Sequence, residues 1–167
     1  DGNKIVTASE YEYPMIWDSK TGQFRAILNE KEQNWKYSIG DNASFSPDGS
    51  RIATSLDKKA KIWNTETAKL LFTLPSTESN IITLEWSPDG LKVSTVNNDK
   101  TARIYDASKG ILLFELKGHR DVVHSVVWSA NSLKVATASA DKTAKIWDAV
   151  SGKLLYTLPW HSKDVLS

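Results

Sequence analysis

An eight-residue box that recurs along the 167-residue chain constrains its fold more than any other feature of the sequence. The box reads Asp-Lys-Thr-Ala-Lys-Ile-Trp-Asp at 141–148, close copies stand at 99–106 and 57–64, and a shorter copy ends at Asp18. Its aromatic position falls at Trp17, Trp63, Tyr105 and Trp147, which are 46, 42 and 42 residues apart. Units of this length are too short to bury a hydrophobic face alone, so the repeat predicts neighbouring units that stack on one another.

Each unit contains the pattern of four short strands, which we call strands a to d in chain order. In the clearest unit the predicted strands are 122–128, 133–139, 143–147 and 154–158. These segments are rich in β-branched and apolar residues, and turn residues separate them. Four strands per unit at this period are typical of a β-propeller blade, so we predict an all-β propeller of four-stranded antiparallel blades.

The repeats divide the chain into one propeller segment, 1–167, with about four units. The predicted units are approximately 1–30, 31–75, 76–117 and 118–158, and 159–167 begins a further repeat. The last residues could pair with the first unit and close a ring of four blades. We instead favour a larger ring, or self-assembly of copies that completes one, because four is the low end of the blade numbers found in propellers.

An insertion interrupts the period around 30–40, where the spacing between equivalent positions grows by about five residues. It contains Trp35 and Tyr37. Loops that a repeat does not require often carry binding residues, so both aromatics are candidate partner contacts. The alternative is that they fold back onto the first blade.

The sequence resembles the WD-repeat (tryptophan-aspartate repeat) β-propeller family over essentially its whole length. Gly118-His119 opens the clearest unit, Trp147-Asp148 ends its third strand, and Ser-Pro-Asp-Gly turns at 46–49 and 87–90 separate strands a and b. The resemblance implies a hydrogen-bonded tetrad that stabilises the blade, formed here by His119, Thr137, Asp141 and Trp147. We expect a structural role for it, because buried polar groups need partners and a satisfied network stiffens its surroundings.

The other units depart from this tetrad. Thr77 stands where the resemblance requires His, Tyr105 replaces Trp, and Tyr11 replaces the Asp of the first unit. Only the unit at 118–158 is therefore expected to have the complete set.

Composition and motifs argue against several functional classes. The chain has no cysteine, only three histidines and a net charge of +1. It contains none of the common hydrolase, zinc-protease or phosphate-binding motifs and no apolar run of roughly 18 residues. We predict no enzyme activity, no catalytic or metal site, no cofactor and no membrane partner. The net charge argues against a globally basic nucleic-acid binder. We expect a cytoplasmic location, with the nucleus as alternative.

The resemblance implies a non-catalytic scaffold for protein–protein interaction, which binds other proteins or peptides on the face that carries the d–a loops and b–c turns. The family's usual contact positions fall on Leu56, Lys58, Asn80, Ile82, Asn98, Lys100, Val122, His124, Ala140 and Lys142, with Asp164 and Leu166 in the last repeat.

Three lysines of this set, Lys58, Lys100 and Lys142, occupy the same place after the turn aspartate. If the ring forms, their charges share one rim, which would favour an acidic or phosphorylated ligand. The alternative is that they are turn residues balanced by the neighbouring aspartates. Two other functions stay open, namely a regulatory or sensor segment of a larger multidomain protein and a direct binder of nucleic acid or phospholipid through the lysines.

Overall fold

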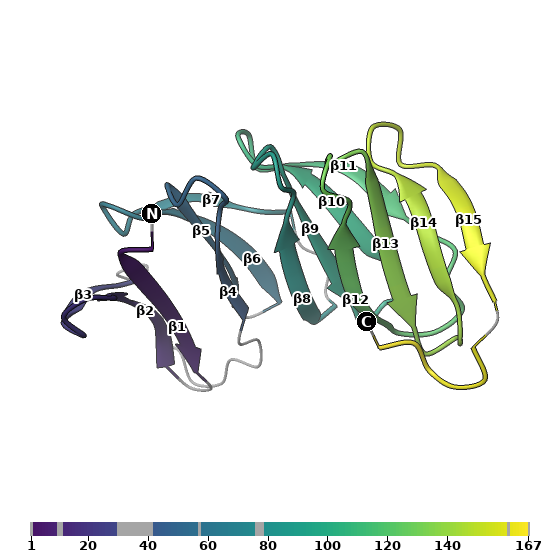
Figure 1. Cartoon of the computed structure of the whole chain (residues 1–167), viewed down its shortest axis with the longest axis horizontal. Helices are drawn as coiled ribbons and strands as arrows, with labels where there is room; N and C mark the ends of the chain where they lie inside the picture. The colour runs from purple at the N-terminus through teal and green to yellow at the C-terminus, as the bar shows by residue number, and fades with distance from the viewer. Residues whose placement is uncertain are drawn as a thin grey trace.

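The computed structural model describes residues 2–9, 12–29, 42–56, 58–75, 79–159 and 161–166. All regular structure in these ranges is β-strand, and four antiparallel sheets follow one another along the chain (Figure 1). The first sheet contains β1 (Lys4–Ser9), β2 (Glu12–Asp18) and β3 (Phe24–Ile27). Its order β1-β2-β3 corresponds to strands b, c and d of one repeat.

The other three sheets contain strands a to d. The second holds β4 (Asn42–Phe45), β5 (Arg51–Leu56), β6 (Lys59–Asn64) and β7 (Leu70–Thr73). The third holds β8 (Ile81–Trp86), β9 (Lys92–Asn97), β10 (Ala102–Asp106) and β11 (Ile111–Leu116). The fourth holds β12 (Val123–Trp128), β13 (Lys134–Ser139), β14 (Ala144–Asp148) and β15 (Leu154–Leu158). The predicted all-β fold with antiparallel blades is confirmed.

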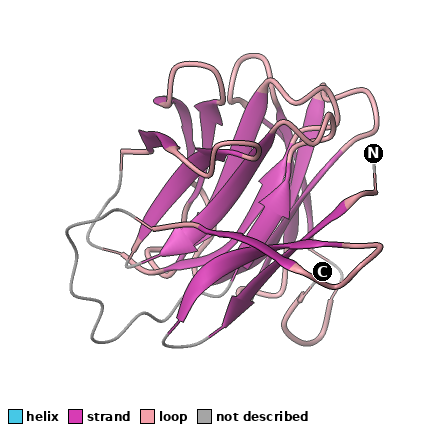
Figure 2. Ribbon diagram, turned by 90° about the vertical axis from the view of Figure 1, so that its left-hand side faces the viewer, coloured by secondary structure: helices cyan, strands magenta, loops and turns pink. Residues whose placement is uncertain are grey.

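The loops lie at the two ends of the strands, so each sheet has loops at both of these ends (Figure 2). The b–c turns and the d–a loops share one end, and the a–b and c–d turns share the other, because successive strands are antiparallel. The described residues that were predicted as partner contacts therefore lie toward the end of the strands that carries the b–c turns and d–a loops.

Two kinds of β-bulge recur in the sheets. Every c–d pair shifts register at the aromatic position of the box, for example between Ile146 and Trp147. The a–b pairs of the third and fourth sheets shift at Ile82 and at His124. Because a bulge bends its strand and increases the local twist, the bulges contribute to the twist of each blade and leave Ile82 and His124 outside the regular pairing.

The hydrophobic core lies between the sheets, in three clusters. In the cluster between the third and fourth sheets, Ile104 and Leu116 pack against Val135 and Trp147. Equivalent residues form the clusters between the first and second and between the second and third sheets. This arrangement agrees with the expectation that no unit buries a face by itself.

An aromatic side chain of strand d also contacts the c–d turn of the next sheet. A Cβ added to Gly110 would lie 2.8 Å from Phe72, and one added to Gly152 would lie 2.7 Å from Phe114. Both glycines have positive φ. The absence of a side chain therefore permits the backbone conformation of the turn and also the close approach of the aromatic ring. We call these aromatics the knobs and these turn residues the notches.

The first and last sheets lie at opposite ends of the longest axis (Figure 1). The residues after β15 remain with the fourth sheet, where the N–H of Val165 donates to the carbonyl of Ser139. Among the described residues no strand pair links 161–166 to β1. The alternative of a ring of four blades closed within one chain is therefore not the arrangement found.

Candidate functional site

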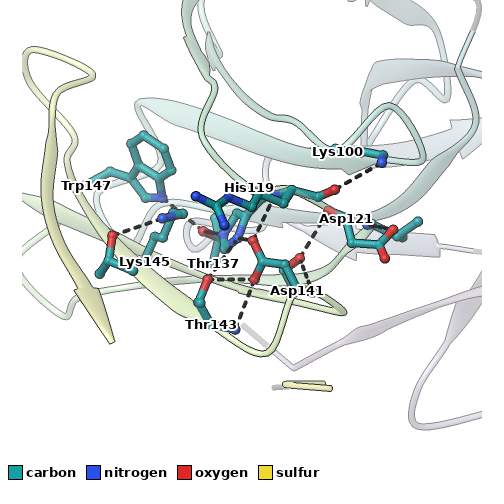
Figure 3. Close-up of polar contacts among 12 residues, drawn as sticks. Lys100, His119, Asp121, Thr137, Asp141, Thr143, Lys145 and Trp147 are labelled. Carbon is teal, nitrogen blue, oxygen red and sulfur yellow. Dashed lines mark hydrogen bonds and ion pairs between the residues drawn. The ribbon is translucent and has the colours of Figure 1, made fainter. Parts of the chain in front are cut away.

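The predicted tetrad is assembled in the fourth sheet (Figure 3). Trp147 Nε1 donates to Thr137 Oγ1 at 2.9 Å, and Thr137 Oγ1 lies 2.7 Å from His119 Nε2. The other ring nitrogen of His119, Nδ1, lies 2.9 Å from Asp141 Oδ2. The four side chains form one continuous chain of hydrogen bonds across strands b and c and the preceding loop.

The direction of this chain follows from the protonation states. Burial lowers the pKa of His119, against the opposing effect of Asp141, so the imidazole is neutral near pH 7. Burial alone would raise the pKa of Asp141, but hydrogen bonds from Thr143, the Arg120 N–H and His119 together hold it below its usual value. His119 Nδ1–H therefore donates to the carboxylate, Nε2 accepts from Thr137, and Thr137 accepts from Trp147.

These contacts leave the tetrad poorly suited to acid–base chemistry. Asp141 Oδ1 also accepts from the Thr143 hydroxyl at 2.6 Å and the Thr143 N–H at 2.9 Å, and Oδ2 accepts from the Arg120 N–H at 2.8 Å. The His119 side chain is completely buried. A general base must reach a substrate proton. The imidazole of His119 does not do so, because it is buried and both of its ring nitrogens take part in hydrogen bonds within the tetrad.

The other sheets contain parts of the tetrad. Trp63 donates to Thr54 at 2.8 Å, and Trp17 donates to Thr7 at the same distance. In the third sheet the Tyr105 hydroxyl donates to the carbonyl of Pro75 at 3.2 Å and is also within hydrogen-bonding reach of Thr95. Tyr105 thus contacts the d–a loop in addition to the hydroxyl position of its own sheet.

Sequence reasoning missed Arg103, which forms ion pairs with the turn aspartate of the third sheet and with Glu115 of strand d. Its guanidinium Nη2 lies 2.7 Å from both Asp99 Oδ2 and Glu115 Oε1, and its side chain is buried. These hydrogen bonds and charges offset the cost of burial, so the pKa of Asp99 stays below its ordinary value. Lys61 and Lys145 occupy the equivalent positions and are also buried. A basic residue four places after each turn aspartate was the available signal.

The three lysines that follow the turn aspartates, which we call the rim lysines, share one backbone conformation. Lys58, Lys100 and Lys142 have φ of 63°, 67° and 67°, and all three are exposed. This left-handed region is uncommon for residues other than Gly, Asn and Asp. Lys100 Nζ donates to the carbonyl of Arg120 at 3.0 Å, so it bridges to the next sheet's loop (Figure 3).

The structure brings the other predicted contact positions of the third and fourth sheets next to these turns. The N–H of Ala140 donates to the carbonyl of Val122 at 2.9 Å, and the N–H of Asn98 donates to that of Asn80 at 3.1 Å. Each b–c turn is thus hydrogen-bonded to its own d–a loop. Asp164 and Leu166, in the last repeat, are exposed.

His124 lies at the bulge of β12 and is half-buried. Its Nε2 is enclosed and has no hydrogen-bond partner within the described part of the chain. Ile82 holds the same place in β8, and its carbonyl accepts a hydrogen bond from Asn42 Nδ2 at 2.8 Å. The bulge at Ile82 therefore takes part in the contact between the inner strands β4 and β8.

Several predicted residues lie outside the described residues. These are Trp35 and Tyr37 of the insertion, together with Tyr11, Asp57, Thr77 and the side chain of Leu56.

The described ranges were compared with the arrangement that a metal site requires. No group of three or more His, Cys, Asp or Glu side chains with the proximity of metal ligands occurs in them. They also include no helix with the length and hydropathy of a membrane span. One open hollow of about 230 Å³ lies where Gly2 and Lys4 of the first sheet meet Phe45 and Pro47 of the second.

The comparison with known families agrees with the geometry. A sequence model of the family described as "WD domain, G-beta repeat" matches residues 37–64, 68–106 and 110–148, which together make up more than half of the chain. A search of curated proteins found no match. The second and third matched ranges begin in the c–d turn before strand d, the first begins outside the described residues, and all three run to the end of strand c.

Proposed function

The chain belongs to the WD-repeat family, whose members generally mediate protein–protein interactions and are typically non-catalytic, and from this premise we propose that it is a non-catalytic scaffold that binds acidic partners. Its binding face carries the d–a loops and b–c turns. The partner is a protein or peptide with a run of carboxylate or phosphate groups.

One observation carries the proposal, namely the shared left-handed conformation of Lys58, Lys100 and Lys142. A β-carbon makes this conformation cost roughly 1–2 kcal/mol per residue, which glycine would avoid. A lysine there adds a charge that the tetrad does not require. Three repetitions of this choice favour a role for the charge in recognition rather than in the turn.

The surroundings of the lysines support an extended acidic ligand. Asn80 and Asn98 offer amide groups beside Lys100, and the exposed guanidinium-bearing Arg120 follows on the next loop. Side-chain amides and cations can together bind carboxylate or phosphate oxygens. The lysine itself recurs in the second, third and fourth sheets, so a ligand that spans two of these blades would meet two lysines.

The test is a binding titration with fluorescently labelled hexaglutamate and with a doubly phosphorylated peptide. We expect the triple variant Lys58→Glu/Lys100→Glu/Lys142→Glu to bind at least about tenfold more weakly, because it replaces attraction by repulsion at three points. A matched control, Lys20→Glu/Lys109→Glu/Lys153→Glu, makes the same charge change in exposed turns at the opposite ends of the strands. It should change the affinity less than about twofold, since distant exposed charges are screened.

Unchanged binding by the rim variant would overturn the proposal. A DNA duplex serves as the second probe, because a polyanion can use the same lysines. Tighter binding of the duplex than of both peptides, with a steep loss of affinity on added salt, would instead assign the rim to nucleic acid.

We also propose that copies of the chain self-assemble to complete a propeller ring, because four is the low end of the blade numbers found in propellers. The cytoplasmic or nuclear location expected from the absence of cysteine stays a prediction, which cell fractionation would test.

A further inference from the structure

One position in the contact between strands c and d differs in charge from sheet to sheet. The residues directly opposite each other at this position are, in the order of the sheets, Met15 and Ile27, Lys61 and Thr73, Arg103 and Glu115, and Lys145 and Thr157. The first sheet thus pairs two apolar side chains, whereas each basic side chain of the other sheets faces an acid or a threonine.

The third sheet shows how a buried cation is neutralised at this position. The side chain of Arg103 is buried, and its Nη2 lies 2.7 Å from Glu115 Oε1. A buried charge costs free energy unless an opposite charge and hydrogen bonds replace the lost water. Glu115 of strand d, together with Asp99, supplies both.

The fourth sheet has the cation without the acid. Lys145 is 7% exposed, and its Nζ donates to Thr157 Oγ1 at 2.9 Å. This is the one hydrogen bond of the ammonium group among the described residues, and no described carboxylate forms an ion pair with it. Because an ammonium group has three N–H donors and a full charge, one neutral hydroxyl compensates its burial incompletely.

Both threonines at this position are exposed and lie in the outermost strand of their sheet. The exposure does not come from an end of the chain, because Thr73 belongs to the second sheet, which packs against a sheet on each side. Thr157 Oγ1 lies on the covered side of the fourth sheet. Its partner Lys145, like Trp147, approaches Gly118 in the loop that follows the third sheet.

The sequence around the two threonines is also nearly identical. Residues 70–75 read Leu-Leu-Phe-Thr-Leu-Pro, and residues 154–159 read Leu-Leu-Tyr-Thr-Leu-Pro. The third sheet has Leu-Leu-Phe-Glu-Leu-Lys at 112–117, so an acid stands where the other two sheets have threonine. An enzyme that modifies one of these threonines therefore meets the same kind of flanking residues at the other.

We infer that Thr157 and Thr73 are phosphorylation sites, to which a protein kinase transfers the γ-phosphoryl group of a nucleoside triphosphate. The threonine oxygen forms a bond to the γ-phosphorus, and the bond from that phosphorus to the β–γ bridging oxygen breaks. The nucleoside diphosphate leaves with the electron pair, and the hydroxyl proton passes to the carboxylate base of the kinase. The phosphate carries a charge of about −1.5 to −2 at pH 7 and lies beside Lys145, as Glu115 lies beside Arg103.

The phosphate joins strand d of the fourth sheet to strand c through a charge-assisted hydrogen bond, which is roughly twice as strong as a bond between neutral groups. The third sheet has this junction without modification. The two sites are independent of the rim lysines, which lie in the b–c turns.

The first experiment looks for the modification in the full-length protein isolated from the cells that produce it. Its peptides are mapped by tandem mass spectrometry, with phosphatases inhibited during isolation. We expect phosphate on Thr157 and Thr73 and none on Thr21 and Thr67, which are exposed threonines of the c–d turns and serve as matched controls. Absence of phosphate from both predicted sites, or an equal amount on the controls, would overturn the inference.

The second experiment tests the ion pair in the full chain, with phosphothreonine incorporated at position 157 during translation. Its equilibrium constant of unfolding in urea should be at least about tenfold lower than that of the unmodified chain, because the phosphate neutralises a buried cation. Lys145→Met should reduce this effect to less than about twofold, since an apolar side chain needs no counter-charge. Lys145→Arg retains the cation and should keep the effect.

Phosphorus NMR gives a readout that a purely structural role of Lys145 would not change. A nearby cation favours the dianion, so the pKa of the phosphate should be lower in the folded protein than in the urea-unfolded chain. In the Lys145→Met background the two pKa values should agree. Equal pKa values with Lys145 present, or an equal gain in stability with and without it, would show that the phosphate does not pair with this lysine and would overturn the assignment.

Discussion

At the residue scale, the hydroxyl of Thr137 holds two buried groups at once. It accepts from Trp147 Nε1 at 2.9 Å and donates to His119 Nε2 at 2.7 Å. In the first sheet the equivalent pair, Thr7 and Trp17, has a bond of 2.8 Å that is open to solvent. The same Thr–Trp hydrogen bond is therefore buried in the fourth sheet and exposed to solvent in the first.

This difference predicts unequal effects of one substitution. Thr137→Val should lower the free energy of unfolding by about 2–3 kcal/mol, because it leaves two buried groups without partners. Thr7→Val should lower it by less than about 1 kcal/mol, since water replaces the lost acceptor. Urea denaturation monitored by tryptophan fluorescence measures both. Equal losses would show that burial of the tetrad contributes nothing to stability.

His119 also predicts a pH dependence. Burial lowers its folded-state pKa below the ordinary value of 6.5, so the unfolded chain binds more protons between the two pKa values. Its contribution to stability is therefore present above about pH 6.5 and is lost as the pH falls toward the folded-state pKa. His119→Gln cannot titrate, so its urea midpoint should fall less steeply between about pH 7 and pH 5. Parallel curves for the two proteins would contradict this role.

The tetrad could be predicted from sequence because the repeat places His119 and Asp141 relative to a known turn and strand. The burial of Arg103 could not be predicted. Side chains alternate along a strand, so Arg103 lies on the face opposite to its neighbour Ile104, and in an isolated sheet that face would be solvated. Its burial depends on what covers both faces of the third sheet. The equal positions of the lysines were visible in the sequence, but the sign of their φ was set by the turn.

At the element scale, the c–d turns connect the fold of one sheet to the packing of the next. Gly152 and Gly22 have φ of +71° and +68°, so both turns require the same backbone conformation at this position. Only Gly152 also meets a neighbouring aromatic ring, that of Phe114. A comparison of the two glycines therefore distinguishes the effect of the turn conformation from the effect of the contact with Phe114.

Alanine at these two positions should have different effects. Gly22→Ala should reduce the free energy of unfolding by about 1 kcal/mol, the strain of a β-carbon at positive φ. Gly152→Ala should reduce it by about 2–4 kcal/mol, because the added carbon also overlaps the Phe114 ring. Chemical denaturation of both variants tests this, and equal losses would show that Phe114 moves aside at no cost.

Strand positions followed closely from the sequence, and pairing details did not. The predicted range 154–158 coincides with β15, and 122–128 begins one residue before β12. The bulges at Ile82 and His124 were not predicted, because nothing in the local pattern distinguishes a residue that is skipped in the ladder from one that is paired. Register depends on both strands and on the sheet packed behind them.

At the scale of the whole molecule, the interior sheets are covered on both faces and the end sheets on one. β9 is almost entirely buried, while β1 alternates between half-buried and exposed and β15 is exposed throughout. In a linear array of this kind, stability depends on each unit's contacts with its neighbours. The ends of the row should therefore open more readily than its middle.

Hydrogen exchange measured by mass spectrometry should show this gradient. Amides of β9 and β10 should exchange most slowly, and those of β1 and β15 fastest, because local opening follows buried contact. The measurement is made at low concentration, where copies do not associate. Uniform protection would mean that the chain opens only as a whole.

The equal distance between knob and notch has a consequence for how such a chain can change in length. Phe72 precedes Gly110 by the same number of residues as Phe114 precedes Gly152. A change of one residue between knob and notch would therefore alter their spacing. Duplication of the third repeat would place Phe114 against a second copy of Gly110, a turn residue that already accepts a phenylalanine, so this repeat is a transferable part for protein engineering.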